Sequence, residues 1–245
     1  MDKALYTVMT GASATLRAQG TVAHNLANAS TVGFKAGFVA TDTFKVPGTG
    51  LPTRIDAVPR ADGFDAAPGS ILNTGGALDV ALHDGVWMAV QAPDGSEAYT
   101  RAGELRISAE GMLTTASGAL VLGDGGPISL PPYEQVQIGG DGTLSIQPLG
   151  QGPQTLAIVG RLKLVQVESP AQLSRGEDGL MRANAELPPA TGTALTAGAL
   201  ENSNVDPAGA LVQMIELSRQ FELQVKVMKD VEDNARSANS LLRLA

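Results

Sequence analysis

The chain of 245 residues shows one hydrophobic pattern at its ends and another in its middle. Over residues 1–28, apolar side chains recur at the three- and four-residue spacing of a helix, with Gln19 as an interruption. After Pro207 the same spacing continues to Arg243, and Gly209 is the only glycine of that segment. Helices of roughly 25 and about 37 residues would extend about 38 and 55 Å at the standard rise. The pattern therefore predicts a long helix at each end of the chain.

The C-terminal helix has a predicted start and a heptad pattern. Asp206 is a favoured N-cap residue, and Pro207 suits the first helical position, where no N–H is needed. The predicted seam, polar in its later part, consists of Leu211, Met214, Ser218, Phe221, Val225, Met228, Glu232, Ala235, Asn239 and Leu242. A second, partial stripe contains Leu217, Val227 and Val231. We expect the two terminal helices to pair with each other and, because their apolar faces are broad, to contact neighbouring chains.

The middle of the chain carries much shorter patterns. Alternating runs such as Val86–Val90 are separated by turn-forming sequences such as Gly139–Gly142 at about ten-residue spacing, which is typical of an all-β module. The Pro-rich residues 44–70 indicate an extended connector, and Gly160-Arg161 is expected to form a tight hairpin turn. The predicted fold class is α+β, with the terminal helices paired as a coiled-coil domain and a middle domain of short antiparallel strands. The expected boundaries are 1–30 for the N-terminal helix, 31–75 for the connector, 76–199 for the β-rich domain and 200–245 for the C-terminal helix.

Composition narrows the function classes. Hydrophobic residues make up 43% but aromatic residues only 4%, so the core must consist of aliphatic side chains, with Trp87 as the expected aromatic anchor. The net charge of -8 argues against nucleic-acid binding. The absence of cysteine excludes disulfides and thiolate metal sites. The N-terminal sequence lacks the features of a cleaved signal peptide, and no apolar run is long enough to span a membrane.

Candidate chemistry is sparse. His24 and His83 have no evident catalytic or metal partner in the sequence, and zinc-type spacing is absent. The glycine-rich runs lack the Lys-Ser/Thr ending of a phosphate-binding loop and are expected to be turns. The carboxylates Glu97, Glu104 and Glu110 could in principle act in a glycosidase, but each lies beside a turn, where acidic residues are common. We therefore expect no enzyme and no catalytic, cofactor-binding or metal-binding residues, with a cell-envelope hydrolase or a secreted adhesin as alternatives.

Several segments resemble a known family. The sequence of residues 25–35, NLANASTVGFK, is similar to the N-terminal signature of the flagellar axial proteins, the rod and hook family. GALENSNVD at residues 198–206 and MIELSRQFE at residues 214–222 resemble its C-terminal signature. Two central segments, GALDVAL at residues 76–82 and AYTRAG at residues 98–103, resemble the shared β domain more loosely. The matches occur in the expected order and touch all three parts of the chain.

The resemblance implies a structural role without cofactors. Within the family the sequence is most similar to proximal rod proteins, with distal rod proteins as the alternative. Its partners would be other copies, neighbouring rod proteins and the flagellar type III export apparatus, with no nucleic acid and no direct membrane insertion. The protein would be made in the cytoplasm, exported without a cleaved signal peptide, and assembled in the periplasm-spanning rod of the basal body. The expected assembly interface consists of Leu5, Val8, Leu16, Leu26, Leu211, Met214, Phe221, Val225, Met228 and Leu242.

The segment after the first helix is expected to be a joint between that helix and the outer domain. Short polar side chains can bond backbone groups that a helix end leaves free. Glycine permits a turn that other residues disfavour, and phenylalanine can anchor the departing chain. The predicted joint residues are Asn25, Asn28, Ser30, Thr31, Gly33 and Phe34.

Overall fold

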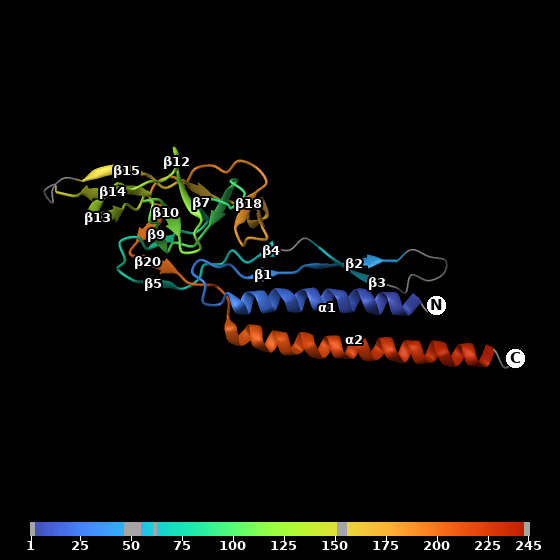
Figure 1. Ribbon diagram of the computed structural model, residues 1–245. Coiled ribbons are helices and arrows are strands. Elements are labelled where there is room, and N and C mark those ends of the chain that lie inside the picture. Colours follow the sequence, from blue (N-terminus) through green and yellow to red (C-terminus); the bar gives the residue numbers. More distant parts are fainter. Residues whose placement is uncertain (1–2, 47–54, 61–62, 151–155, 243–245) are drawn as a thin grey trace. The chain divides into compact units, whose positions relative to one another are not determined.

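The chain, known from a computed structural model, divides into two compact units (Figure 1). The structure describes residues 3–46, 55–60, 63–150 and 156–242. Unit 1 consists of Met1–Ala27, Gly37–Phe64 and Val205–Ala245. Unit 2 consists of Asn28–Ala36 and Asp65–Asn204. The chain therefore passes between the units four times, and each unit is described below by itself.

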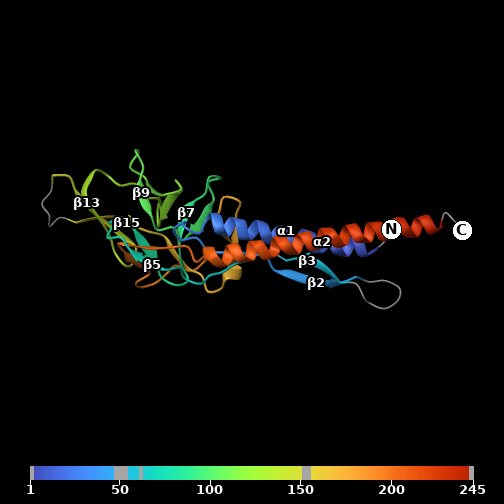
Figure 2. The ribbon, with the colours of Figure 1, turned by 90° about the horizontal axis from the view of Figure 1, so that it is seen from below.

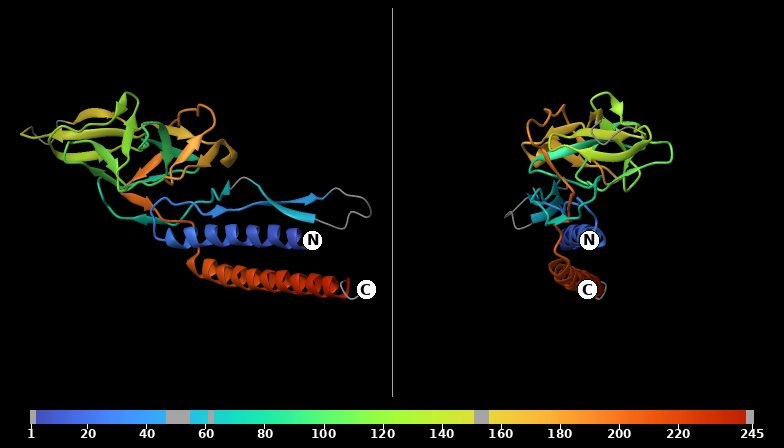
Figure 3. Two further views of the ribbon diagram at one scale, coloured as in Figure 1. Left: turned by 45° about the vertical axis from the view of Figure 1, so that its right-hand side comes forward. Right: turned by 90° about the vertical axis from the view of Figure 1, so that its left-hand side faces the viewer.

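Unit 1 contains both long helices predicted from the periodicity, which are confirmed. Its elements are α1 (Lys3–Ala27), β1 (Gly37–Phe38), β2 (Thr41–Lys45), β3 (Ile55–Pro59), β4 (Gly63–Phe64) and α2 (Pro207–Leu242). The helices run antiparallel along one another (Figure 2). Strands β2 and β3 pair antiparallel, and β3 packs on α1, so that α1 lies between this pair and α2 (Figure 3). The residues expected as an extended connector thus include paired strands.

The start of α2 is set by its first residues. Asp206 Oδ1 accepts a hydrogen bond from the Ala208 N–H and Oδ2 accepts one from the Gly209 N–H, both at 3.1 Å. These bonds satisfy two of the N–H groups that a helix start leaves without partners. Pro207 is the first helical residue and has no N–H to satisfy. None of the described helices is both long and apolar enough to cross a membrane.

Each helix has a row of buried and half-buried positions at heptad spacing. On α1 the row is Leu5, Val8, Ala12, Thr15, Gln19, Val22 and Leu26. On α2 it is Ala210, Met214, Leu217, Phe221, Gln224, Met228 and Val231. The row on α2 shares Met214, Phe221 and Met228 with the predicted seam, but Leu211 and Val225 remain 50% and 43% exposed. Because apolar residues flank the row on both sides, the periodicity by itself did not define the rotation of α2.

Unit 2 is built mainly from short strands, as predicted. Its strands are β5 (Ile71–Asn73), β6 (Val80–Leu82), β7 (Val86–Gln91), β8 (Glu97–Thr100), β9 (Leu105–Ile107), β10 (Leu113–Thr115), β11 (Leu120–Gly123), β12 (Gly126–Pro127), β13 (Tyr133–Ile138), β14 (Thr143–Pro148), β15 (Ala157–Arg161), β16 (Leu164–Gln166), β17 (Leu173–Arg175), β18 (Met181–Ala183), β19 (Leu195–Ala197) and β20 (Ala199–Glu201). The largest sheet has the order β17-β18-β8-β7-β11-β10-β9, with β16 on β7 and β12 on β11. Smaller antiparallel sheets are β13-β14-β15, β19-β6 and β20-β5. A short 3-10 helix spans Pro170–Gln172.

The core of unit 2 is aliphatic and lies between these sheets. Met88, Leu113 and Leu144 are completely buried, and Trp87 is only 4% exposed, which confirms its prediction as an aromatic core residue. Alternating inward and outward residues along β13 and β14 place one face of that sheet in the core.

The hairpin predicted at Gly160-Arg161 is wrong. Both residues lie inside β15, which pairs with β14, whereas β16 pairs with β7 in the largest sheet. The two apolar runs therefore enter different sheets, and this arrangement buries Leu162 and Leu164 in the core at 1% and 5% exposure.

Truncation of a core side chain should destabilise unit 2. We expect Leu113→Ala to lower its free energy of unfolding by about 2–5 kcal/mol, because the cavity adds to the lost apolar burial. Urea unfolding followed by the fluorescence of Trp87, the only tryptophan, measures this unit. The matched control is Ile158→Ala, where the side chain is 74% exposed and the change should stay within about 0.5 kcal/mol. Equal effects of the two substitutions would contradict this assignment of the core.

Candidate functional site

A buried ion cluster connects three distant segments of unit 2. Glu201, at the end of β20, accepts hydrogen bonds from Lys35 Nζ at 2.7 Å on Oε1 and from Arg101 Nε at 2.7 Å on Oε2. The side chains of Lys35, Arg101 and Glu201 are 2%, 4% and 1% exposed. Lys35 and Glu201 are 166 positions apart in the chain, so the cluster forms only when both segments dock on unit 2.

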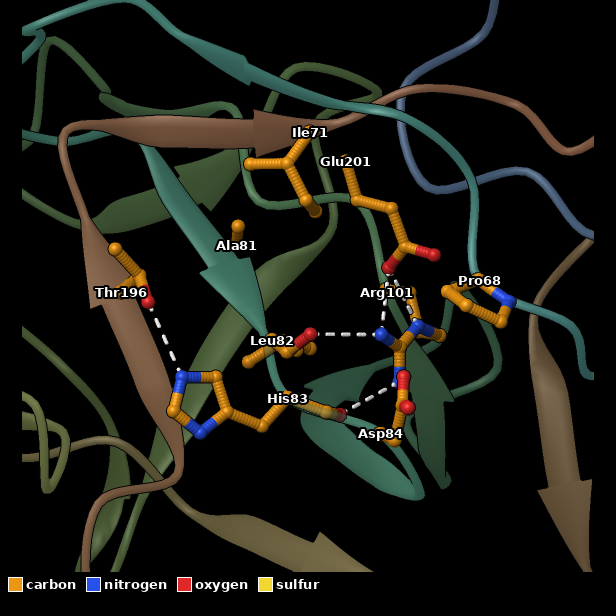
Figure 4. Close-up of a pocket in the computed structure, with 9 residues that line it drawn as sticks. All are labelled: Pro68, Ile71, Ala81, Leu82, His83, Asp84, Arg101, Thr196 and Glu201. Carbon is orange, nitrogen blue, oxygen red and sulfur yellow. Dashed lines mark hydrogen bonds and ion pairs between the residues drawn. The ribbon is translucent and has the colours of Figure 1, made fainter.

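Every N–H of the Arg101 guanidinium has an acceptor. Besides the Glu201 carboxylate, the Nη1 atom donates to the carbonyls of His83 and Val86 at 3.0 and 2.8 Å, and Nη2 donates to the carbonyl of Leu82 at 2.7 Å. Figure 4 shows the guanidinium between Glu201 and the backbone of Leu82 and His83. A planar fork with five donors suits this arrangement, which an ammonium group could not complete. Arg101 therefore anchors Glu201 rigidly to the loop between β6 and β7.

The remaining groups of the cluster are also paired. Lys35 Nζ donates to the Ala67 carbonyl at 2.8 Å, and the Gly69 N–H donates to Glu201 Oε1 at 2.9 Å. Burial lowers the pKa of Lys35 below its ordinary value, although the hydrogen bond with Glu201 opposes this shift. Burial on its own raises the pKa of Glu201, but the charge of Arg101 and the hydrogen bond from Lys35 lower it below its ordinary value. The carboxylate of Glu201 is thus held in its ionised form.

Asn204 joins the points where the chain leaves unit 2. Its Oδ1 accepts from the Ala36 N–H at 2.7 Å, and its Nδ2 donates to the carbonyls of Asp65 and Ala67 at 3.0 Å each. The Asp65 N–H donates to the Ala36 carbonyl at 2.8 Å, and the Asn204 N–H donates to the Phe34 carbonyl at 3.3 Å. The chain passes between the two units at four points. Three of these points, next to Ala36, Asp65 and Asn204, are thus joined by one set of hydrogen bonds within unit 2.

Two of the predicted joint residues, Gly33 and Phe34, lie beside this cluster. Gly33 has φ of +69°, and its N–H donates to the Glu201 carbonyl at 2.7 Å. A Cβ at Gly33 would come within 2.3 Å of the Arg101 backbone, so both its conformation and its surroundings require glycine. The Phe34 ring lies 4.8 Å from the guanidinium of Arg175, which also donates to the Lys35 carbonyl. Gly33 is thus held by Glu201 and the Arg101 backbone, and Phe34 and Lys35 are held by Arg175.

The polar joint residues bond in two ways. Asn25, within unit 1, holds both backbone groups of Gly37: Nδ2 donates to its carbonyl and Oδ1 accepts from its N–H, each at 2.8 Å. In unit 2 the Thr31 hydroxyl donates to Asn28 Oδ1 at 3.2 Å, and the Thr31 N–H donates to the Asn28 carbonyl at 3.1 Å. Ser30 is exposed. These bonds keep the chain compact where it leaves α1.

Sequence reasoning did not single out Lys35, Arg101, Glu201 or Asn204 as site residues. All four lie within the segments that carry the family resemblance. A usable signal was that Lys35 and Glu201 are isolated charges in otherwise uncharged stretches, which is unusual for a solvated surface. Their pairing could not be inferred, because nothing local relates positions so far apart.

A pocket of about 390 Å³ opens beside the ion cluster. It is lined by Pro68, Ile71, Ala81, Leu82, His83, Asp84, Arg101, Thr196 and Glu201 (Figure 4). The His83 ring is hydrogen-bonded to the Thr193 carbonyl at 3.2 Å and to the Thr196 hydroxyl at 3.1 Å. The ring of His83 and the side chains of Arg101 and Glu201 are therefore all held in hydrogen bonds where they line the pocket.

The three carboxylates considered for a hydrolase, Glu97, Glu104 and Glu110, are each bonded to a neighbouring side chain. Glu97 pairs with Lys163 at 2.7 Å, and Glu104 pairs with Arg106 at 2.6 Å. A hydrogen bond from Ser108 lowers the pKa of Glu110. Within the described part of the chain, no group of three or more His, Asp or Glu side chains is placed to hold a metal ion.

The expected assembly residues divide into two sets in unit 1. Leu5, Val8, Leu26, Met214, Phe221 and Met228 are half-buried. Leu16, Leu211 and Val225 are exposed, at 49%, 50% and 43%. The side chain of Leu242 lies outside the described residues. The exposed set remains available to another chain.

Neutralising Glu201 should destabilise unit 2 in a pH-dependent way. At pH 7 we expect Glu201→Gln to cost about 3–5 kcal/mol, because it leaves buried cations without a counter-charge. Since the folded pKa of Glu201 lies below its unfolded value of 4.5, the stabilisation present above that pH is lost as the pH falls through the folded pKa. Urea unfolding followed by Trp87 fluorescence should therefore show a smaller difference from the parent protein at pH 4 than at pH 7. The control, Glu97→Gln in an exposed pair, should cost less than about 1 kcal/mol.

Adding a methyl group at Gly33 should be costly for two separable reasons. Gly33→Ala introduces strain at positive φ and a clash with the Arg101 backbone, whereas Gly75, at φ of +68°, has nothing within 4 Å of its Cβ position. We expect Gly75→Ala to cost about 1 kcal/mol and Gly33→Ala to cost clearly more. Thermal unfolding of both variants measures the difference. Equal losses would show that Gly33 is needed only for its conformation.

Three family models match successive parts of the chain. Residues 5–35 match the flagella basal body rod protein family. Residues 84–146 match the D1 domain of the flagellar hook proteins FlgE, FlgF and FlgG, and residues 196–241 match the C-terminal region of the flagellar basal body rod FlgEFG proteins. The first and third matches include Lys35 and Glu201, respectively, and the second includes Arg101.

Full-length relatives agree with these matches. The flagellar basal-body rod proteins FlgF of Escherichia coli (strain K12) and of Salmonella typhimurium (strain LT2) are each 43% identical over 253 aligned residues, with all of both chains covered. The flagellar basal-body rod protein FlgG of Buchnera aphidicola (subsp. Schizaphis graminum) is 31% identical, with 92% of this chain and 94% of the relative covered. With these relatives and family matches, the chain belongs to the flagellar basal-body rod protein family and is of the FlgF type.

Proposed function

We propose that this chain is a structural subunit of the proximal part of the flagellar rod. Copies of it assemble helically with neighbouring rod proteins into the shaft that transmits torque for motility. The support is the 43% identity over the full length to the FlgF proteins of Escherichia coli and Salmonella typhimurium, against 31% to the FlgG protein of Buchnera aphidicola, the distal-rod alternative. A structural role requires no cofactor and no catalytic group.

The observation that carries this proposal is the exposed apolar surface of unit 1. The helices expose Tyr6, Met9, Leu16, Leu211, Val212, Ile215, Leu223, Val225 and Val227, each between 43% and 64%. Soluble monomers rarely expose large contiguous apolar patches, and such patches mark interaction sites. Helix α2, with α1 along one side, leaves both flanks of its packed row to solvent. Such exposed apolar flanks are expected of a subunit whose helices are buried by neighbouring subunits in an assembly.

We also propose that α1 and α2 pair as a coiled coil within each subunit. The heptad rows of the two helices and their antiparallel course support this pairing. The polar members Gln19 and Gln224 would favour one register over others at a cost in stability. Gly11, next to Ala12 of the row, lies against Gln224: a Cβ there would approach the Gln224 amide nitrogen to 3.3 Å. The helices thus approach closely at this point.

The proposal extends to the route and location of the protein. A rod subunit acts across the periplasm, and we infer export by the flagellar type III apparatus in an unfolded state. Large exposed apolar flanks on free helices favour ordering of unit 1 on assembly, where new contacts offset the entropy lost. The joint that attaches the two helices would consist of two segments held in unit 2, Gly33 to Lys35 and Glu201 to Asn204.

Removal of the C-terminal helix should abolish assembly without unfolding unit 2. We expect deletion of residues 206–245 to eliminate rods and swimming, because the exposed flanks of α2 are lost. Motility in soft agar and electron microscopy of isolated basal bodies measure this, and Trp87 fluorescence of the purified variant should still report a buried tryptophan. The full-length gene is the matched control. Normal rods in the deletion strain would contradict the proposed function.

A further inference from the structure

Two segments of unit 2 that are far apart in the sequence are bonded directly to one another. The entry segment, residues 30–36, follows α1, and the exit segment, residues 198–204, precedes α2. Three backbone N–H groups join them, at 2.7, 2.7 and 3.3 Å: Gly33 donates to the Glu201 carbonyl, Ala36 to Asn204 Oδ1 and Asn204 to the Phe34 carbonyl. Each segment therefore supplies hydrogen-bond partners that the other one needs.

The entry segment docks among cations. Lys35 and Arg101 are both buried, and the guanidinium of Arg175 lies over the Phe34 ring. Among the described residues, the carboxylate of Glu201 is the one within ion-pair distance of Lys35 or Arg101. The positive charges that surround the entry segment are therefore compensated mainly from the exit segment.

Without Glu201, docking of the entry segment would bring two like charges together in a buried site. Burial and the charge of Arg101 both lower the pKa of Lys35, whereas Glu201 raises it. The exposed carboxylate of Asp84 acts in the same direction as Glu201, but more weakly and from beyond ion-pair distance. Because an uncompensated buried charge is strongly unfavourable, the entry segment cannot dock stably before the exit segment brings Glu201.

The exit segment is also the last part of unit 2 along the chain. Unit 2 ends at Asn204, and α2 begins at Pro207. Lys35 and Glu201 are 166 positions apart, and closing a loop of this size costs entropy before any contact forms. Contacts between the two segments are therefore expected late in folding.

From these observations we propose that Glu201 acts as a latch that closes unit 2. The entry and exit segments dock in one event, which is the last step in the folding of this unit. The segment after α1 is consequently not held until the segment before α2 is in place. For a subunit that folds after export, as proposed above, the attachments of both helices would form together, but the latch itself does not require that route.

Hydrogen exchange of the purified full-length protein, read by mass spectrometry of its peptides, tests the coupling. Lys35→Met removes one cation and keeps the Arg101–Glu201 pair, so the core of unit 2 should stay folded. Because the segments open together, protection should fall at least about tenfold in both, including the Asn202 amide, which bonds the Ser70 carbonyl and not Lys35. Glu201→Gln should lower the protection of both segments on the order of a hundredfold or more.

The matched control is Lys163→Met, which breaks an exposed pair with Glu97. It should change the protection of neither segment by more than about fivefold. A loss of protection confined to the segment that carries the substitution would overturn the latch. If Glu201→Gln unfolds unit 2 entirely, so that β7 and β14 also lose protection, Lys35→Met decides the question.

Pulse labelling during refolding from urea tests the order of events. The entry and exit segments should gain protection in the same phase, and no earlier than the core strands β7 and β14. Protection of either segment in a phase before the other, or before the core strands, would overturn the proposal. Both experiments use purified protein, so their failure is distinct from that of the proposed function, which is judged by rods and motility.

Discussion

The carboxylate of Glu201 determines the arrangement of unit 2 at the points where the chain enters and leaves. A buried carboxylate is unfavourable without compensating charges and hydrogen bonds. Here Lys35, Arg101 and the Gly69 N–H supply them from three separate segments. Each segment must be docked before the charges are compensated. The segment after α1 and the segment before α2 are therefore held on unit 2 together or not at all.

The neighbouring Asn204 and Gly33 extend this constraint to the backbone. Asn204 bonds the chain at residues 36, 65 and 67, and Gly33 approaches Arg101 more closely than any side chain would allow. Unit 2 has an aliphatic core and a buried ion cluster whose carboxylate is compensated, although the buried Arg175 Nε has no hydrogen-bond partner. Unit 1 differs, because its helices keep apolar flanks exposed. The first arrangement suits a stable module and the second a surface completed by other subunits.

Predictions from the sequence succeeded where one short segment contains the whole signal. The apolar spacing predicted both helices, Asp206-Pro207 marked the start of α2, and the surroundings of Trp87 indicated a core strand. They failed where the partner of a segment had to be chosen. Gly160-Arg161 has the composition of a turn, yet these residues continue β15, which pairs with β14, and the next apolar run pairs with β7 in another sheet. The α2 row could likewise not be chosen between adjacent apolar stripes.

By itself, the sequence determined the helical ends, the β-rich middle and, through its resemblance, the protein family. These features depend on spacing over a few residues, because a helix repeats every 3.6 residues and a strand every two. The tertiary structure alone decided that Lys35, Arg101 and Glu201 form one ion cluster and that Leu16, Leu211 and Val225 stay exposed. Contacts between residues 100 or 166 positions apart leave no periodic trace. They depend on which surfaces the fold buries, and burial is a property of the packed chain as a whole.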